Sequence, residues 1–530
     1  MLYFVPAWYH NNEWCENEQA WSVRRTQSEF DDTVKQIQLF HRSNLYPFVI
    51  LLLSAAPNFR HFLHRQGTYR APYWSCFDSI QEIRRRKAAV FSFRDLNWPD
   101  GTEFVYNPFE VFAMVNGELY AQIVFGEYGN MIYINMYRDG AVLRQNVYDD
   151  RGFIASTILY DQGNPHHKDY LMENGVWKIR YYYSDGHIEV NPEAPTYLMV
   201  NGDEECQYTF TSMNYEKMDY LIEEVLNTYL ASVAGNDIFC IAMHKLHMKT
   251  MENTMLGRNL VLSFFKDRYS LEDLEEAEKL IEMSDYIVAD SRESRTFITY
   301  RMRHSIRNIT DISPFDTRVD LGISQQLTVQ KVLLPVDGLV DELFEKVVIG
   351  LGEYLSQNKY VQVHIFTRDI YYKKPAILLD RISRILSDNS MEANWAIPMD
   401  ERDAMMEDEE TEIVPQRFYV EQCVSEIEVS KCIREQRLLI DLRDVPEMYL
   451  QISAISVCIP QIVRTKTQFI ENGKNGKVID DVAELAEVMR YYLDGLANWN
   501  EAAVNSYEIG KRFSTKVLIN KWKGIIRSIG

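Results

Sequence analysis

Short apolar runs alternate with helical stretches in the first part of the chain. Leu2 to Trp8, Phe48 to Ala56 and Ala88 to Leu96 carry few polar residues. They predict strands buried on both faces, as in a parallel sheet covered by helices. Farther along, the pattern predicts a helix over Tyr215 to Ala231 and a strand over Asp237 to His244. Strands that alternate with helices in this way indicate a doubly wound α/β domain.

The same alternation returns near Leu321 and predicts a second doubly wound domain. Its expected strands are Val329 to Val336, Val361 to Thr367, Arg417 to Gln422, Leu438 to Leu442 and Ile459 to Arg464. Between two of these strands, Asp400 to Glu412 is a block of like charge, which indicates a loop. The chain ends with helical runs at Asp481 to Asp494, Glu501 to Arg512 and Ser514 to Ile529. The predicted fold class is therefore α/β, with two Rossmann-type domains in tandem.

An antiparallel β-meander interrupts the first domain. Glycines recur there at nearly constant spacing, at Gly117, Gly129, Gly140, Gly152, Gly163, Gly175 and Gly186. Several follow Asn or Asp, and such pairs supply the positive φ angles that tight hairpins need. Alternating segments such as Ile132 to Tyr137 and Trp177 to Tyr183 lie between the turns. The tyrosines of this sheet either pair across strands and cover the adjoining domain, or form a docking face for a protein or a glycosylated chain.

These patterns divide the chain into four parts. Residues 1–98 and 207–320 form the first Rossmann-like domain, residues 99–206 the inserted sheet, residues 321–500 the second Rossmann-like domain, and residues 501–530 the C-terminal helices. We expect the C-terminal helices to pack back on the first domain. At about 150 residues per domain, a chain of 530 residues has room for this division.

The last predicted helix is basic and amphipathic. Leu518, Trp522 and Ile525 fall on one side, and lysines and an arginine supply positive charge elsewhere. Such a helix either packs its apolar side on a domain and leaves the lysines in solvent, or lies on an anionic membrane surface. Peripheral membrane contact therefore stays open as an interpretation.

The composition argues against some partners and compartments. With 56 Lys and Arg residues against 77 Asp and Glu residues, the formal net charge is −21, which repels nucleic acid as a whole. The opening residues, MLYFVPAWYH, lack the basic start and the long apolar stretch of a signal peptide. The run from Pro47 to Ala56 is too short to span a membrane. We expect a cytoplasmic protein, with peripheral contact at the inner face of the membrane as the one membrane role left open.

No metal or cofactor site is apparent from residue spacing. The seven cysteines are widely scattered and contain no C-x-x-C pair, which is typical of reduced thiols. The two histidine pairs, His166 with His167 and His244 with His247, lack companion ligands at useful offsets. We therefore predict no metal and no cofactor.

Two doubly wound domains followed by a returning helix resemble a GT-B glycosyltransferase. The stretch from Phe469 to Trp499 reads FIENGKNGKVIDDVAELAEVMRYYLDGLANW. It is similar to the part of the retaining family-4-like enzymes in which a glycine turn precedes a helix beside the donor pocket. The inserted meander is similar to the sheet insertion of the glycosyltransferases that modify serine-rich bacterial adhesins. The resemblance implies a GT-B fold over nearly the whole chain.

The residues at the implied nucleotide-sugar site differ from those of the enzymes. GT-B enzymes hold the donor diphosphate with an Arg and a Lys after the first strand of the second domain, where this chain has Val336 and Asp341. A carboxylate about 4 Å from a phosphate costs roughly 4 kcal/mol at an effective dielectric of about 20. Where the enzymes have two glutamates, this chain has Val445 and Ser453, and Glu447 lies out of register. The resemblance therefore implies a degenerate donor pocket.

The first domain departs from the enzymes as well. Phosphate or sugar usually approaches through a glycine-rich loop at a helix N-terminus, but Tyr9 to Trp14 contains no glycine. The chain resembles one family in particular. The resemblance rests on the retained fold with altered donor residues, on the opening YFVPAWY, and on the tryptophans Trp8, Trp14 and Trp21. By these features the chain is identified as a member of the first accessory secretory protein family of the accessory Sec system.

This resemblance implies a non-catalytic role in protein export. Members resemble inactive GT-B enzymes and act with two companion accessory secretory proteins and the accessory Sec motor ATPase. Together they deliver glycosylated serine-rich repeat adhesins to the membrane channel. Candidate glycan contacts are Trp8, Tyr9 and Trp14. The alternative interpretation is that these three side chains are structural residues of the core. The rival interpretation is an active glycosyltransferase with a non-standard donor site, for which His244 and His247 are the candidate bases.

Overall fold

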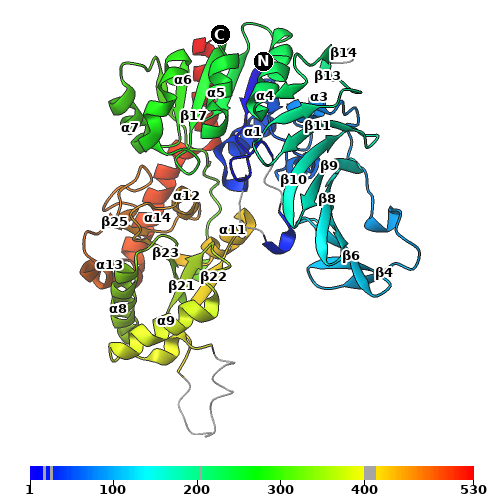
Figure 1. The fold of residues 1–530 in the computed structure, drawn as a ribbon. Coiled ribbons are helices and arrows are strands. Elements are labelled where there is room, and N and C mark those ends of the chain that lie inside the picture. Colours follow the sequence, from blue (N-terminus) through cyan, green and yellow to red (C-terminus); the bar gives the residue numbers. More distant parts are fainter. Residues whose placement is uncertain (16–18, 24–27, 202–203, 399–413, 530) are drawn as a thin grey trace. The chain divides into compact units, whose positions relative to one another are not determined.

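The computed structural model describes residues 1–15, 19–23, 28–201, 204–398 and 414–529 (Figure 1). The chain forms two compact units. The first unit comprises Met1–Asp290, Ser294–Ile312 and Lys523–Gly530, and the second unit comprises Ser291–Glu293 and Ser313–Trp522. The acidic block predicted as a loop, Asp400 to Glu412, lies outside the described residues.

A seven-stranded parallel sheet forms the centre of the first unit, in the order β19-β18-β17-β16-β1-β2-β3. Its strands are β1 (Leu2–Val5), β2 (Phe48–Leu52), β3 (Tyr73–Ser75), β16 (Ile238–Ala242), β17 (Asn259–Phe264), β18 (Tyr286–Ala289) and β19 (Ile309–Asp311). Its helices are α1 (Asp32–Ser43), α2 (Phe59–Arg65), α3 (Cys76–Ile80), α4 (Met218–Ala231), α5 (Lys245–Thr254), α6 (Glu278–Met283) and α7 (Arg292–Met302). The chain order reverses at β1, which pairs with both β16 and β2.

Strand β1 is buried on both faces, as its apolar sequence predicts. Val5 belongs to the hydrophobic cluster that includes Leu221 of α4. On the other face, the rings of Phe4 and Phe40 of α1 lie 5.1 Å apart. The doubly wound prediction for this part of the chain is therefore confirmed.

The prediction of a strand over Ala88 to Leu96 is wrong. The third strand on this side of the sheet is β3, and the predicted stretch contains only a short 3-10 helix, Phe93–Asp95. Phe93 packs in the hydrophobic cluster of the inserted sheet, and the backbone N–H of Ala89 donates to Asp150 O at 2.9 Å. Phe91, Phe93 and Leu96 thus pack on the inserted sheet instead of extending the parallel one, whereas Val90 is exposed.

The inserted sheet is antiparallel and has ten strands, in the order β15-β12-β11-β10-β9-β8-β7-β6-β5-β4. The strands are β4 (Glu103–Tyr106), β5 (Glu110–Val115), β6 (Glu118–Phe125), β7 (Met131–Arg138), β8 (Ala141–Asp149), β9 (Phe153–Asp161), β10 (Asn164–Leu171), β11 (Trp177–Tyr182), β12 (Ile188–Val190) and β15 (Asn214–Tyr215). Two further strands, β13 (Thr196–Asn201) and β14 (Glu204–Thr209), pair with each other. At one turn, Asn116 and Gly117 have φ of 52° and 82°, the left-handed pair that a two-residue hairpin requires. The meander is therefore confirmed, with its turns at the predicted glycines.

The second unit contains a six-stranded parallel sheet, in the order β22-β21-β20-β23-β24-β25. Its strands are β20 (Gln330–Pro335), β21 (Val361–Thr367), β22 (Phe418–Gln422), β23 (Gln436–Asp441), β24 (Gln461–Val463) and β25 (Gly476–Val478). Its helices are α8 (Asp341–Gln357), α9 (Pro375–Asp388), α11 (Glu426–Arg434), α12 (Met448–Ser456), α13 (Leu485–Leu493) and α14 (Leu496–Gly510), and α15 (Thr515–Ile529) ends the chain. Along β20, Val332 and Leu334 pack in one hydrophobic cluster and Leu333 in another, so the strand is buried on both faces. None of the described helices combines the length and the hydropathy needed to span a bilayer.

Candidate functional site

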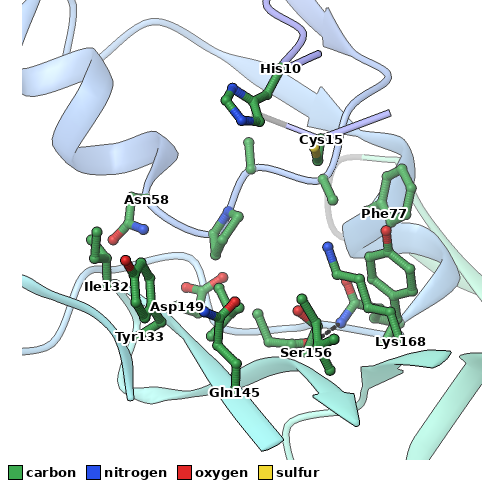
Figure 2. A pocket seen from close by; sticks show the side chains of 18 of the residues that line it. His10, Cys15, Asn58, Phe77, Ile132, Tyr133, Gln145, Asp149, Ser156 and Lys168 are labelled. Atoms are coloured by element: carbon green, nitrogen blue, oxygen red, sulfur yellow. Dashed lines mark hydrogen bonds between the residues drawn. The ribbon is translucent and has the colours of Figure 1, made fainter. Parts of the chain in front are cut away.

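The first candidate site is a cavity of about 260 Å³ in the first unit. It lies where the loops at the carboxyl ends of β1 and β2 meet helix α3 and strands β7 to β10. Figure 2 shows His10 and Cys15 on one side of the open space, and Gln145 and Ser156 on the opposite side. Ligands of open α/β sheets bind at this end of the strands. The cavity therefore occupies a position where the fold favours binding.

The cavity combines aromatic rings with a few polar groups. Lys168 Nζ lies 4.8 Å from the centroid of the Tyr170 ring, and Glu13 adds a carboxylate to the lining. Burial raises the pKa of Tyr170 and of Tyr133, so both hydroxyls stay protonated at neutral pH. The volume lies just below the roughly 300–1,000 Å³ of common ligand pockets. Such a lining suits a small polar molecule, such as a single sugar unit.

A buried ion network, which we did not predict, holds one wall of this cavity. The turn Asp149-Asp150-Arg151 joins β8 to β9. Arg60 Nε of α2 lies 2.5 Å from Asp150 Oδ1, and Arg151 Nη2 lies 2.8 Å from Asp78 Oδ1 of α3. The backbone N–H of Arg60 also donates to Asp150 Oδ2 at 3.0 Å, which satisfies an amide in the first turn of α2. The sequence predicts the turn, because Gly152 marks it. It does not indicate the ion-pair partners Arg60 and Asp78, because they lie far from the turn along the chain.

The three predicted glycan contacts have partners within the first unit. Trp8 Nε1 donates to Asp31 Oδ1 at 3.1 Å. The Tyr9 hydroxyl lies 2.8 Å from His247 Nδ1, and the ring of Tyr9 meets that of Trp14 edge-on at 5.4 Å. Trp14 is 7% exposed. These contacts favour the core role that the sequence left open for the three side chains.

The two histidines considered as bases form part of the same packing. His247 Nε2 lies 2.7 Å from Ala242 O, so this nitrogen carries the proton and Nδ1 accepts from the Tyr9 hydroxyl. His244 Nδ1 accepts from the backbone N–H of Leu246 at 3.1 Å and caps α5. Burial lowers the pKa of His247 to about 3 and that of His244 to about 4. Both rings are neutral near pH 7, and the acceptor nitrogen of His247 is already occupied.

The second candidate site is the carboxyl edge of the second sheet, where the resemblance implies a sugar-nucleotide donor. Val336 follows β20 and is buried, and its backbone N–H donates to Phe366 O at 3.0 Å. Asp341 begins α8 with its side chain 85% exposed, and Asp341 Oδ1 lies 2.8 Å from Arg381 Nη1. In water-like surroundings, repulsion between Asp341 and a phosphate about 4 Å away is about 1 kcal/mol. This repulsion is weaker than we expected from the sequence.

The other predicted donor-pocket residues follow β23. Val445 is exposed, and Ser453 lies half-buried on α12. Glu447 directly precedes α12, and Glu447 Oε1 lies 2.9 Å from Arg368 Nε. The carboxylate that the sequence placed out of register is thus paired with a cation from the loop after β21.

Three cations that we did not consider from the sequence lie on loops at this edge. Arg368 follows β21, Arg443 follows β23, and Lys373 precedes α9. Arg443 donates twice to Asp441, at 2.8 and 2.7 Å, and Lys373 Nζ lies 3.1 Å from Asp337 Oδ1. With Arg368 already paired, each of the three has a carboxylate partner. Arg368 directly follows a buried strand, and a basic residue at that position was the available sequence signal for a cation at this edge. The pairing itself depends on loops that meet only in the fold.

The fold also brings together residues that could hold a metal. All seven cysteines lie in the described part of the chain and are reduced thiols. Glu421, Cys423 and Cys432 place one carboxylate oxygen and two sulfurs within 4.8 Å of one another. Their sequence spacing is unlike that of common zinc sites, so it gave no indication of this group.

The sequence matches a family model along almost its whole length. The model is that of the accessory Sec system protein Asp-one, the first accessory secretory protein, and the match covers residues 1–528. The chain is also 30% identical over 538 residues to the accessory Sec system protein Asp-one of Streptococcus gordonii. That alignment covers 99% of this chain and 98% of the relative.

Solved structures are also similar over the full chain, including the following two. A crystal structure of accessory secretory proteins 1, 2 and 3 in Streptococcus pneumoniae contains a chain with a TM-score of 0.82 and 26% identity, with coverage of 100% of this chain and 99% of that one. The pneumococcal O-GlcNAc transferase GtfA, solved with UDP and GlcNAc, has a TM-score of 0.68 and 11% identity, with coverage of 100% and 98%. The second likeness concerns the fold alone, and it confirms the GT-B-like architecture.

Proposed function

Because the chain belongs to the family of the accessory Sec system protein Asp-one, we propose that it is a non-catalytic component of the accessory Sec export system. In this role it scaffolds two companion accessory secretory proteins. It also helps to bind glycosylated serine-rich adhesins and to deliver them to the translocase with the motor ATPase. We place this work in the cytoplasm, with peripheral contact at the inner face of the membrane as a further proposal.

The observation that carries the non-catalytic role is the pairing of cations at the carboxyl edge of the second sheet. A donor diphosphate needs cations that are free to bind it. Arg368, Lys373 and Arg443 each face a carboxylate within hydrogen-bond distance. Arg443 and Asp441 are both buried, and breaking such a pair costs about 3–5 kcal/mol, so a diphosphate would have to offset that loss before it gained a contact from Arg443. The pairs of Arg368 and Lys373 are partly exposed and hold these two cations less strongly.

The S. pneumoniae assembly supports the proposed partners. That crystal structure is of accessory secretory proteins 1, 2 and 3 together, and one of its chains is similar to this one from end to end. A chain of the same family and fold has corresponding surfaces to offer. We therefore propose companions of the same two kinds for this chain.

For the glycan contact we propose the cavity of the first unit. Trp8, Tyr9 and Trp14 are engaged within the unit, whereas the neighbouring cavity offers tyrosine rings beside polar groups. Aromatic rings stack on the apolar faces of sugars, and polar groups fix their hydroxyls. Saturation-transfer NMR with N-acetylglucosamine should give ring-proton signals with the native chain and reduced signals with Tyr133→Ala. Equal signals from the two proteins would remove the cavity from this role.

The rival enzyme is tested by calorimetry with UDP and UDP-N-acetylglucosamine. We expect no binding heat at millimolar ligand, and no sugar transfer, from the purified chain or from the chain with both companions. GtfA under the same conditions serves as the positive control, because its structure was solved with UDP. Stable co-elution with both companions is the second expected result. Micromolar UDP binding would contradict the non-catalytic role, and failure to co-elute would contradict the scaffold.

A further inference from the structure

Three metal-ligand side chains meet at the edge strand of the second sheet. Glu421 lies on β22, Cys423 directly follows that strand, and Cys432 lies on α11. Glu421 contributes a carboxylate oxygen, and the two cysteines contribute Sγ atoms within 4.8 Å of it and of each other. Because α11 directly follows β22 in the chain, the turn between them lets a helix residue lie against the strand. This contact joins residues whose sequence spacing resembles no common zinc motif.

We propose that Glu421, Cys423 and Cys432 form a zinc-binding site with a fourth position open to water. Zn²⁺ accepts thiolate and carboxylate ligands and favours tetrahedral coordination. With bond lengths of about 2.0–2.3 Å, neighbouring ligand atoms of a tetrahedral site lie roughly 3.5–3.8 Å apart. Side-chain adjustments of about 1 Å would therefore bring the three atoms from their present separation to ligand positions.

Neighbouring side chains hold two of the ligands in place. His364 Nδ1 of β21 lies 2.8 Å from Glu421 Oε1. Because an ionised carboxylate only accepts, the proton of this bond resides on Nδ1. Gln436 Nε2 lies 3.8 Å from Cys432 Sγ and 3.1 Å from Cys432 O. Partners of this kind orient metal ligands and tune their basicity.

The position also allows an ion to enter. Strand β22 is at the edge of the sheet, and the Glu421 side chain is 37% exposed. Cys432 is half-buried, whereas Cys423 is 4% exposed. The group thus has a solvent-facing carboxylate and a buried thiol, as expected for a site that opens to water on one side.

A disulfide between Cys423 and Cys432 is the main alternative use of these thiols. A disulfide would use both sulfurs but assign no role to Glu421 or to the His364 contact with it. A bound cation uses all three atoms and gains from the negative charge of the carboxylate. The metal site therefore accounts for more of the arrangement.

Titration of the reduced, chelator-treated full-length chain with Co²⁺ tests the proposal. We expect one equivalent of Co²⁺ to produce a thiolate-to-cobalt charge-transfer band and the visible bands of tetrahedral cobalt. One equivalent of Zn²⁺ should abolish both. Cys432→Ser should lose the charge-transfer band or shift it strongly, and Glu421→Gln should weaken Co²⁺ binding at least tenfold.

Cys206→Ser is the matched control, because Cys206 is an exposed thiol on β14 and should leave binding unchanged. Thermal unfolding of each variant shows whether it is folded. If Cys432→Ser does not fold, Glu421→Gln still tests the site, because it preserves the shape of a partly exposed side chain. Absence of the bands in the folded native chain would overturn the proposal. So would equal bands in the native chain and both site variants, or a Cys423–Cys432 disulfide whose reduction yields no metal uptake.

Discussion

His247 is a residue whose side chain has a structural role, because both ring nitrogens are hydrogen-bonded inside the protein. Its ring is fully buried, with Nε2 donating to a backbone carbonyl and Nδ1 accepting from the Tyr9 hydroxyl. Burial, followed by the neighbouring His244, lowers the pKa of His247 to about 3. The unfolded chain, with a histidine pKa of about 6.5, binds a proton far more readily. The stability that neutral His247 contributes is therefore complete above about pH 6.5 and declines as the pH falls toward 3.

This linkage predicts an acid sensitivity that one substitution removes. Between about pH 6.5 and pH 5, the free energy of unfolding should fall by about 2 kcal/mol through His247. His247→Gln cannot titrate, so its loss of stability over the same interval should be smaller by that amount. Urea unfolding at the two pH values measures the difference, with the exposed His304→Gln as control. Equal pH dependence in the native chain and His247→Gln would show that the burial of His247 has no such effect.

At the scale of elements, the turn between β8 and β9 attaches the inserted sheet to the parallel sheet. Asp150 is 3% exposed, pairs with Arg60, and accepts a backbone N–H in the first turn of α2. The backbone N–H of Asp150 donates to Pro57 O at 3.0 Å, next to the cavity. One side chain therefore joins a turn of one sheet to a helix start of the other.

Loss of this carboxylate should destabilise the first unit. We expect Asp150→Ala to lower its free energy of unfolding by about 3–5 kcal/mol, because the substitution leaves the buried Arg60 without one of its charge partners. The control is Asp161→Ala, an exposed position at the end of β9 in the same sheet. Thermal unfolding monitored by circular dichroism measures both. If the two variants lose the same stability, Asp150 does not join the sheets energetically.

At the scale of the whole molecule, α15 belongs to both compact units. Its residues up to Trp522 group with the second unit, and those from Lys523 onward group with the first. Leu518, Trp522 and Ile525 are each no more than 2% exposed. The apolar side of this helix is thus buried within the protein, whereas Lys516, Lys523 and Arg527 are exposed.

Deletion of Lys516 to Gly530 should therefore act first on stability. Each of the three apolar side chains contributes about 1.5–3 kcal/mol through burial, so their joint removal should cost on the order of 5 kcal/mol. At roughly 2–4 °C per kcal/mol, the melting temperature should fall by about 10–20 °C. Sedimentation with anionic liposomes is the companion measurement. Lipid binding that disappears while the melting temperature stays unchanged would instead assign the helix to the membrane.

Local pattern was enough for much of the fold, and its failures are informative. Asn116-Gly117 forms the left-handed turn that its residues require. The predicted strand over Ala88 to Leu96 is absent, because a short apolar segment that packs on a sheet has the same sequence pattern as a segment that forms a strand. The short strand Tyr73–Ser75 offered too few residues for a periodic signal.

The candidate sites were harder to predict from the sequence, because their contacts join segments that are far apart along the chain. Position along the chain located Val336 and Asp341 at the edge of the second sheet, but it gave no information on how exposed Asp341 is. The pairing of Arg368 with Glu447 joins loops 79 positions apart. Such contacts depend on which strands become neighbours.

By itself, the sequence determined the α/β class, the tandem arrangement of the sheets and the inserted meander, because apolar periodicity and turn residues act locally. Only the tertiary structure decided that His247 is a packed neutral ring, that Arg368, Lys373 and Arg443 are paired with carboxylates, and that Glu421 meets two cysteines. Burial and charge pairing depend on distances between segments, and these distances exist only once the chain has folded.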